Sequence, residues 1–172
     1  MLPTIQTDRL ILRQMEEKDA AQIFFLRSDA EILKYIDIKK AETIEDALAF
    51  IKKINDGIAK DGLTYWAIAM KDTDELIGTI CIWNVNQDHF RAEIGFSLHT
   101  KYQGKGYMNE SIKPVVDHAF RQMKLHSLEG RVLPLNTASI NVLERNGFVK
   151  EAHFTEDSYC DGTEKWELRS EK

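Results

Sequence analysis

The spacing of hydrophobic residues changes abruptly in the middle of the chain. Ile94, Phe96 and Leu98 alternate with polar or small residues, and such alternation predicts a strand. The segment Gln103-Gly104-Lys105-Gly106 interrupts this pattern, and apolar residues then recur every three or four positions, as in a helix. These later residues are Met108, Ile112, Val115, Val116, Ala119, Phe120 and Met123. The stretch predicts a strand, a tight loop with two glycines and a helix, in that order.

The remainder of the chain yields further helices and strands by the same criteria. Helical spacing is found at 20–27 and after Thr43, whose hydroxyl is expected to cap a helix that ends near Gly57 or Gly62. A short helix is expected between Asn136 and Gly147. Strands are predicted at 7–13, 64–70, 76–85, 125–134, 148–154 and 164–169, with turns at 71–75 and 161–162. This order predicts a mixed α/β sheet with helices packed on it.

Composition and charge narrow the classes of partner. A chain of 172 residues with 43% hydrophobic residues is sized for one compact domain, which we expect to span 1–172. The net charge is −5 and no run of Lys or Arg exceeds two residues, so nucleic acid and anionic membranes are not expected as partners. There is no apolar run long enough for a membrane span and no signal peptide, which predicts a cytoplasmic protein.

Residue types that bind metals or stabilise a core give few functional signals. The cysteines Cys81 and Cys160 form neither a metal motif nor a disulfide framework. The five histidines have no ligand spacing, so no metal site is expected; they are His89, His99, His118, His126 and His153. Three tryptophans, Trp66, Trp83 and Trp166, lie in predicted strands and are expected in the core. Of these, Trp83 is the one that could reach a substrate cleft.

The glycine-containing loop has the chemistry of a phosphate-binding site. Glycine allows a sharp turn and close approach of a ligand, and the first N–H groups of the following helix carry the positive end of its dipole. A dinucleotide-binding fingerprint fits badly, because Asn109 stands where the third glycine belongs and no acidic residue follows at the expected distance. A P-loop is excluded, since no Gly-Lys-Ser/Thr sequence follows.

The loop instead resembles motif A of the GCN5-related N-acetyltransferase (GNAT) superfamily, Gln/Arg-x-x-Gly-x-Gly/Ala. The match covers Gln103 to Met108, and Met108 departs from the usual Gly or Ala. Four blocks over nearly the whole chain resemble, in order and spacing, the ribosomal-protein N-terminal (Rim-type) acetyltransferase-like subgroup. These blocks are 7–13, 93–98, 103–110, and 136–139 followed by 142–148.

This resemblance implies a fold and a co-substrate. The fold would be a mixed, mostly antiparallel sheet of about seven strands with about four helices, splayed between its fourth and fifth strands. Acetyl-CoA would bind as co-substrate in that opening, with its pantetheine arm along the backbone of Phe96, Ser97 and Leu98 and near Asn136. Its pyrophosphate would lie on the N–H groups of Gln103, Gly104, Lys105, Gly106, Tyr107 and Met108.

Acetyl transfer to an amine requires a base, a group that stabilises the oxyanion and a proton for the thiolate. We expect Glu93 to be the base, since the resemblance places it at the subgroup's usual base position; the alternative is a solvated strand-edge carboxylate beside Arg91. A backbone N–H of Leu98 or Ser97 would meet the oxyanion. Many family members supply the proton from a tyrosine, but Leu143 stands at that place here. Ser139 is the substitute we expect, and the alternative is a helix-capping serine.

The acceptor and the competing functions are less constrained by the sequence. The lead hypothesis is an acetyl-CoA-dependent N-acetyltransferase acting by direct attack of a primary amine, on a peptide N-terminus or a small molecule. A non-catalytic acyl-CoA-binding module and a nucleotide-binding regulator are the alternatives. The acidic chain, with Glu42, Glu45 and Asp46 at the second helix, suits a cationic acceptor, although these carboxylates also suit the first turn of any helix. A monomer or homodimer is expected.

Overall fold

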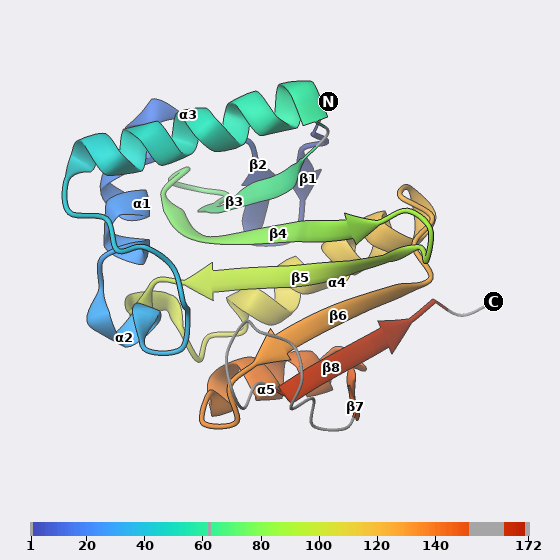
Figure 1. Ribbon diagram of the computed structural model, residues 1–172. Helices are drawn as coiled ribbons and strands as arrows, with labels where there is room; N and C mark the ends of the chain where they lie inside the picture. The colour runs from blue at the N-terminus through green and yellow to red at the C-terminus, as the bar shows by residue number, and fades with distance from the viewer. Residues whose placement is uncertain (1, 62, 152–163, 171–172) are drawn as a thin grey trace. The chain divides into compact units, whose positions relative to one another are not determined.

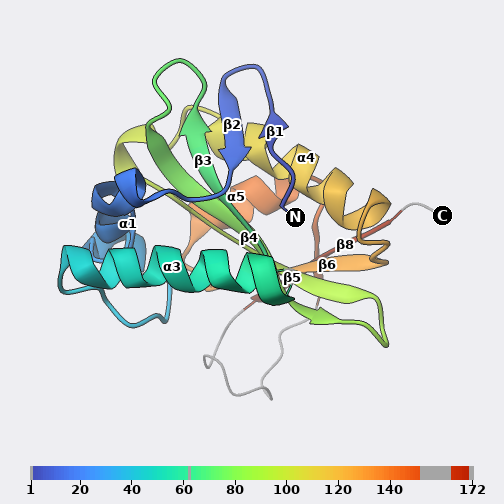
Figure 2. The ribbon, with the colours of Figure 1, turned by 90° about the horizontal axis from the view of Figure 1, so that it is seen from above.

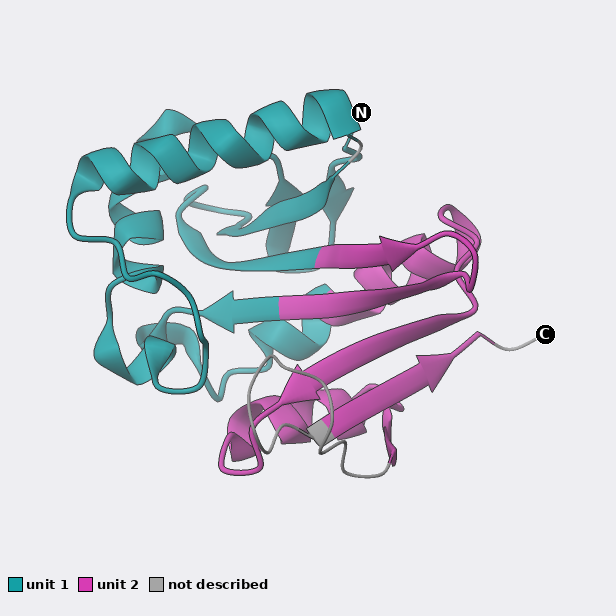
Figure 3. Cartoon of the chain, viewed as in Figure 1, with its two compact units in different colours: residues 1–81, 96–111 teal, residues 82–95, 112–172 magenta. Residues whose placement is uncertain are grey.

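Eight strands and five α-helices are present in the computed structural model, within the residues it describes, which are 2–61, 63–151 and 164–170 (Figure 1). The chain divides into two compact units, shown in Figure 3. Unit 1 comprises residues 1–81 and 96–111, and unit 2 comprises residues 82–95 and 112–172. The strands β4 (Leu76–Asn86) and β5 (Arg91–Leu98) each contribute residues to both units. The expectation of a single domain therefore stays a prediction.

Unit 1 holds the N-terminal strands and most of the helices. The strand order is β1-β2-β3-β4-β5, and β2 pairs with β1 and β3 in antiparallel register, with Leu12 opposite both Ile5 and Ile68. The elements wholly within unit 1 are β1 (Ile5–Gln6), β2 (Leu10–Arg13), η1 (Glu17–Asp19), α1 (Ala20–Leu26), α2 (Ala30–Leu33), α3 (Ile44–Asp61), β3 (Thr64–Met70) and η2 (Thr100–Tyr102). The helix α4 (Tyr107–Arg121) begins in unit 1 and continues in unit 2.

The core of unit 1 forms because α3 is amphipathic. Ala47, Ile51, Ile54 and Ile58 lie on one face and are buried, and α3 packs beside α1 (Figure 2). The buried cluster consists of Met15, Ala20, Ile23, Leu26, Ile32, Ala47, Ile51, Ile54, Ile58, Ala67 and Leu76. At about 25 cal/mol per Å² of apolar surface removed from water, such a cluster is the main stabilising term of the unit.

The start of α3 confirms Thr43 as a helix cap. Thr43 Oγ1 accepts a hydrogen bond from the Asp46 N–H at 3.3 Å. In return, Asp46 Oδ2 accepts from the N–H groups of Glu42 at 2.8 Å and Thr43 at 3.1 Å. These backbone hydrogen bonds lower the pKa of Asp46. The helix continues through Gly57 and ends at Asp61, directly before the Gly62 position that the sequence offered as its end.

Unit 2 contains the parallel strand pair. Its strand order is β4-β5-β6-β8-β7, with β6 (Ser127–Val132), β7 (Val149–Glu151) and β8 (Glu164–Arg169). The strands β6 and β7 both pair antiparallel with β8, whereas β5 and β6 are parallel. The helix α5 (Thr137–Arg145) follows β6. Mixed, mostly antiparallel pairing confirms the predicted fold class, with one more strand than the seven expected.

Several local predictions need correction. Trp66 and Trp166 are buried, with 0% and 5% of their surface exposed, but Trp83 is 45% exposed and lies outside the core. The strand expected over 125–134 is limited to Ser127–Val132. The segment predicted to be extended over 148–154 contains β7, and its last three positions, the Cys160 position and the predicted turn at 161–162 lie outside the described residues.

Candidate active site

The glycine loop has the backbone conformation that its sequence predicts. Gly104 and Gly106 have φ of +73° and +81°, in the left-handed region where side chains are strained. A Cβ on Gly104 would meet nothing within 4 Å, so the space beside the loop is open. The loop is exposed and leads directly into α4 at Tyr107. An exposed turn with bare backbone at a helix N-terminus fits phosphate groups.

An ion pair ties this loop to the N-terminal strands. Glu110, in the first turn of α4, accepts hydrogen bonds from the Arg9 N–H at 2.8 Å, from Arg9 Nε at 2.7 Å and from Thr7 Oγ1 at 2.6 Å. The Arg9 guanidinium also donates to the Lys105 carbonyl at 3.2 Å and lies 4.3 Å from the Tyr107 ring centroid. Partial burial raises the pKa of Glu110, and the hydrogen bonds from Thr7 and Arg9 outweigh that effect, so its pKa lies below the ordinary value.

The remaining loop residues differ in how they can contact a ligand. Gln103 Nε2 donates to the Leu98 carbonyl at 3.0 Å and so links the loop to the end of β5. The Met108 side chain is buried, with 5% exposed, which leaves only its backbone for ligand contact. Its departure from the family motif is therefore accommodated by packing inside the protein.

The end of β5 lies unusually close to β4. A Cβ on Gly78 would lie 2.5 Å from the Ser97 carbonyl oxygen, a distance that only glycine avoids. The His99 N–H donates to the Ile77 carbonyl at 2.8 Å, and the hydroxyls of Ser97 and Thr79 are 3.1 Å apart. Ser97 is half-buried and Leu98 is 9% exposed. Pairing of this backbone with the pantetheine arm stays a prediction.

In unit 2 the parallel ladder between β5 and β6 is short. It has three pairs, Arg91 with Ser127, Ala92 with Leu128 and Glu93 with Glu129. The strand β6 continues past this point and pairs with β8 through Val132. A ladder that ends while its strands continue leaves backbone N–H and C=O groups without a strand partner. The place where it ends carries the expected base, Glu93.

Glu93 is a buried carboxylate held by two side chains. It is 6% exposed, its Oε1 accepts from Asn84 Nδ2 at 2.7 Å, and Arg131 Nε lies 3.5 Å from the same oxygen. Asn84 has φ of +49°, a left-handed conformation that asparagine tolerates better than most residues. The alternative of a solvated carboxylate beside Arg91 is wrong, because Glu93 is buried and Arg91 lies 3.9 Å from Glu129 instead.

Sequence reasoning missed Glu129 and the cations around it. Glu129 is 7% exposed and lies opposite Glu93 in the ladder, and Lys165 Nζ lies 2.7 Å from its Oε1. Arg131 lies between the two carboxylates, 3.5 Å from Glu93 and 4.0 Å from Glu129. The two buried carboxylates are therefore accompanied by two cations, Arg131 and Lys165. Alternation in β6 places Glu129 and Arg131 on one face, which was the available signal.

The start of α5 decides the capping alternative for Ser139, and its role as proton donor stays a prediction. Asn136 is the N-cap, and its Oδ1 accepts from the Ser139 N–H at 3.1 Å. Ser139 therefore does not cap the helix with its hydroxyl, and the capping alternative is wrong. The Asn136 Nδ2 group has no hydrogen bond to any described residue, so it is available as a donor. The two residues are half-buried.

Leu143, at the position where the family resemblance leads us to expect a tyrosine, is a packing residue. Its side chain is fully buried, and a Cβ on Gly130 of β6 would lie 2.8 Å from one of its methyl groups. The residue therefore fills the space over a glycine in the strand. Tyr107, the first residue of α4, contacts Arg9 instead, as described above.

The structure places the predicted site residues in two groups. Phe96, Ser97, Leu98 and the loop residues 103–108 belong to unit 1, and Glu93, Asn136 and Ser139 belong to unit 2. Within the described ranges there is no group of His, Cys, Asp and Glu residues that could hold a metal ion. The same part of the chain contains no helix of sufficient length and apolar character to cross a membrane.

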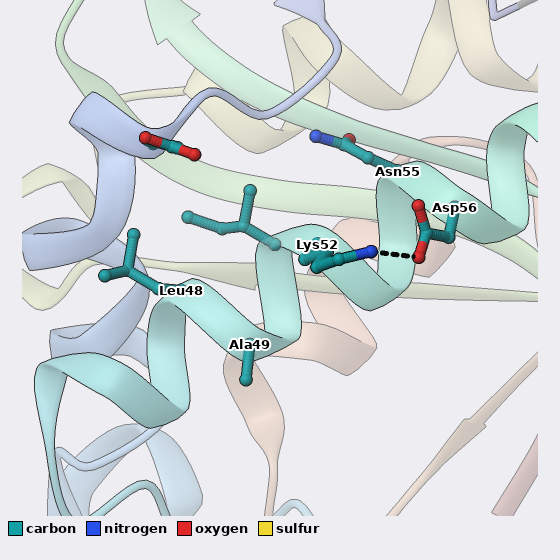
Figure 4. Close-up of a pocket in the computed structure, with 7 residues that line it drawn as sticks. Leu48, Ala49, Lys52, Asn55 and Asp56 are labelled. Carbon is teal, nitrogen blue, oxygen red and sulfur yellow. Dashed lines mark hydrogen bonds and ion pairs between the residues drawn. The ribbon is translucent and has the colours of Figure 1, made fainter.

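A pocket of about 480 Å³ lies along α3, in unit 1 (Figure 4). Its lining consists of Glu17, Leu48, Ala49, Ile51, Lys52, Asn55 and Asp56. The ion pair between Lys52 and Asp56, 2.6 Å long, lies at its edge. None of the residues predicted for catalysis or for binding acetyl-CoA lines this pocket.

Comparison with known proteins identifies the family. A profile of the acetyltransferase (GNAT) domain matches residues 9–149. The uncharacterized N-acetyltransferase p20 of Bacillus licheniformis is 36% identical over 150 residues, which cover 87% of this chain and 84% of that protein. The crystal structure of a GNAT-family acetyltransferase from Bacillus anthracis superimposes with a TM-score of 0.80, at 27% identity and 96% coverage of both chains. The chain belongs to the GNAT acetyltransferase family.

Two further relatives have named acceptors. The ribosomal protein uS5-alanine N-acetyltransferase of Escherichia coli is 27% identical over 92% of this chain and 84% of its own length. The spermidine N(1)-acetyltransferase of Vibrio cholerae is 26% identical over 90% of this chain and 87% of its own. Together with the family match, these relatives confirm the predicted enzyme class. The protein is an N-acetyltransferase that uses acetyl-CoA as its acetyl donor.

Proposed function

We propose that Glu93 is the general base of this acetyltransferase and that the acceptor is a primary amine on a peptide N-terminus or a small molecule. The observation that carries the proposal is the burial of Glu93 at the last pair of the parallel ladder, where Asn84 and Arg131 hold its carboxylate. An aliphatic amine is mostly protonated near neutral pH, so a fixed carboxylate can remove its proton directly or through water. The neutral amine then attacks without a covalent enzyme intermediate.

Acetyl-CoA, when bound, supplies the activated acetyl thioester. The loop 103–108 would hold its phosphates through backbone N–H groups, helped by the positive end of the α4 dipole. The backbone of Phe96, Ser97 and Leu98 would orient the pantetheine arm, and the N–H of Ser97 or Leu98 would stabilise negative charge on the carbonyl oxygen. Asn136 Nδ2 would donate a hydrogen bond to the same arm.

Ser139 would supply the thiolate with a proton, through its hydroxyl or a water that it holds. Support comes from the cap geometry, because Asn136 satisfies the Ser139 N–H and leaves the hydroxyl without a capping role. Leu143, which replaces the tyrosine of many relatives, carries no ionisable group. A thiolate has a moderate pKa, so water can share this step.

The related acetyltransferases act on a ribosomal protein and on spermidine, which supports both a peptide and a small amine as candidate acceptors for this chain. A cytoplasmic enzyme, monomeric or homodimeric, is the form that we propose, because its donor is a metabolite of that compartment. Sedimentation of the purified protein would measure the oligomeric state.

A thiol-release assay with acetyl-CoA against peptide N-termini, polyamines, amino acids and aminoglycosides tests the proposal. We expect turnover with at least one amine, and loss of that turnover in Glu93→Gln. Calorimetry with acetyl-CoA is run in parallel. Tight binding of acetyl-CoA without turnover on any amine would show a non-catalytic acyl-CoA-binding module instead.

A further inference from the structure

Arg27, at the C-terminal end of α1, is a half-buried cation without an acidic partner. Its guanidinium carbon lies 4.0 Å from the ring centroid of Phe50, a residue of α3. Within the part of the chain that the structure describes, no carboxylate forms an ion pair with it, and its side chain makes no hydrogen bond. Arg13 in the same unit shows the contrast, since its guanidinium binds Asp19 at 2.8 Å and Asp74 at 2.7 Å.

An unpaired guanidinium in this position has an energetic cost. Burial lowers the pKa of Arg27, yet arginine remains protonated at any physiological pH. The cation therefore keeps its charge and presents N–H donors that stacking on an aromatic ring does not satisfy. The buried Arg13 is thus bound by carboxylates, whereas Arg27 has no anionic partner among the described residues.

Arg27 is connected to β5 through side chains of unit 1. The Phe50 ring meets the Tyr65 ring edge-on, with centroids 5.8 Å apart. Tyr65 donates a hydrogen bond to Thr79 Oγ1 at 3.3 Å, and the Thr79 and Ser97 hydroxyls are 3.1 Å apart. We call Arg27, Phe50 and Tyr65 the Arg27 cluster; all three are half-buried. The hydroxyl chain ends at the residue expected to orient the pantetheine arm.

We propose that Arg27 binds a carboxylate of the acceptor, so that the preferred acceptors are amines that carry a carboxylate, such as amino acids or peptides with an acidic residue near the N-terminus. This inference rests on the proposed function, because it concerns the acceptor of the same reaction. It replaces the expectation of a cationic acceptor. Asp46 is one of the acidic residues on which the expectation of a cationic acceptor was based. Its carboxylate accepts hydrogen bonds from the backbone at the start of α3 and is therefore engaged within the protein.

A carboxylate fits the Arg27 cluster better than a phosphate. A planar guanidinium matches the two oxygens of a carboxylate in a bidentate pair, and the ring of Phe50 keeps the guanidinium plane fixed. One unpaired cation balances one negative charge, whereas a phosphate monoester carries nearly two at neutral pH. The test therefore includes an amine with a phosphate.

The experiment compares matched acceptors in the thiol-release assay. The pairs are an amino acid and its amide, and peptides that differ by Asp against Asn or Glu against Gln in the first two positions; phosphoethanolamine is a separate arm. We expect kcat/KM to be at least about ten-fold higher for the carboxylate member, since hydrogen bonds to charged groups contribute by such factors. Arg27→Gln should remove this preference mainly through KM, and Arg27→Lys should retain part of it.

A matched control is Lys52→Gln, which removes an exposed cation of α3 and should leave the preference unchanged. Acetyl-CoA affinity, measured by calorimetry, should be the same in the wild type and in Arg27→Gln. Equal turnover of both members of each pair, a preference for phosphoethanolamine, or an unchanged preference in Arg27→Gln would overturn the inference while the proposed function stands.

Failure of the proposed function gives a different result, which is absence of turnover with every amine. In that case, calorimetry of the carboxylate amines with the complex of protein and coenzyme A still decides the inference, because Arg27→Gln should weaken their binding. If Arg27→Gln does not fold, the wild-type preference and the Arg27→Lys variant provide the same comparison.

Discussion

Arg9 and Glu110 are 101 positions apart in the chain, yet Arg9 donates to Glu110 from its backbone at 2.8 Å and from its side chain at 2.7 Å. The pair fixes the first turn of α4 to the loop between β1 and β2. Because the Arg9 guanidinium also reaches the Lys105 carbonyl, the same contact supports the loop that is expected to bind phosphate. We therefore expect both the stability of the protein and its affinity for acetyl-CoA to depend on the Glu110 carboxylate.

Glu110→Gln should lower the melting temperature at pH 7 and lose this effect in acid. The pKa of Glu110 is below its ordinary value in the folded protein, so its contribution is present above the unfolded pKa of about 4.5 and is lost as pH falls through the folded pKa. For a partly exposed pair we expect about 1 kcal/mol, or about 2–4 °C. Thermal melts between pH 7 and pH 3 measure this loss of stability. The control is Asp117→Asn, which removes an exposed ion pair with Arg121. Equal destabilisation at both pH values would contradict the assignment.

Glu93→Gln should lower kcat by about 100-fold or more, the usual contribution of a positioned general base, with little change in acetyl-CoA affinity. The deficit should shrink at high pH, where the amine is already neutral. Steady-state thiol release across pH measures both effects. Glu129→Gln removes the neighbouring buried carboxylate and should change stability more than kcat. Wild-type turnover of Glu93→Gln at pH 7 would assign the step to another base or to water.

Ser139→Ala should reduce kcat less than Glu93→Gln does, because water can protonate a thiolate of moderate pKa. The helix itself should keep its stability, since Asn136 bonds the Ser139 backbone and not its hydroxyl. Thiol release and a thermal melt of the same preparation test both expectations. A loss of turnover as large as that of Glu93→Gln would make Ser139 indispensable.

Gly106→Glu should abolish acetyl-CoA binding, because it places a negative charge where backbone N–H groups are expected to meet the pyrophosphate. Its φ of +81° strains any side chain, so Gly106→Lys is the matched variant with the same backbone cost and the opposite charge. Calorimetry should find that Gly106→Glu binds acetyl-CoA more weakly than Gly106→Lys does. Both variants should keep the circular dichroism spectrum of the native protein. Unchanged affinity of a folded Gly106→Glu protein would place the phosphates elsewhere.

The expected contact of Asn136 with acetyl-CoA can be tested separately from its observed role as the N-cap of α5. Asn136→Asp keeps an oxygen for the Ser139 N–H and should retain stability, whereas Asn136→Ala should cost about 1 kcal/mol by loss of the cap. Asn136→Asp replaces the Nδ2 donor by a charged oxygen acceptor, so a lower kcat/KM for acetyl-CoA in this stable variant would report the expected contact with the pantetheine arm. If Asn136→Asp has wild-type kinetics, Asn136 is a structural cap alone.

The sequence predicted those elements whose periodicity is long enough to be recognised. The strands β3 and β8 have the predicted bounds, and α3 and α4 begin where the caps and glycines indicated. The strand β1 and the helix α2 were not predicted, because two and four residues are too few to establish a period. Trp83 was misplaced because alternation in a strand does not reveal which face, or which end, remains exposed.

The site was predictable only where it depends on local sequence. The glycine loop is such a case, since the turn and the helix start lie within a few residues. The partners of Glu93 depend on contacts between strands, and the pairing of Glu93 with Glu129 follows from a register that no local pattern specifies. For this reason the sequence analysis did not identify the side chains that contact Glu93 and Glu129, which are Asn84, Arg131 and Lys165. It also could not show that Arg27 has no acidic partner among the described residues.

Gly130 and Leu143 restrict how this enzyme can change. A side chain on Gly130 would collide with Leu143 at 2.8 Å, and a larger residue at 143 would enter the same space over the strand. We therefore expect Leu143→Tyr to be destabilising as a single step, because Leu143 is fully buried against Gly130 and the larger ring would need more space. We expect the residues at 130 and 143 to be epistatic, so that a tyrosine proton donor at 143 would arise only after, or together with, compensating changes in the packing around it.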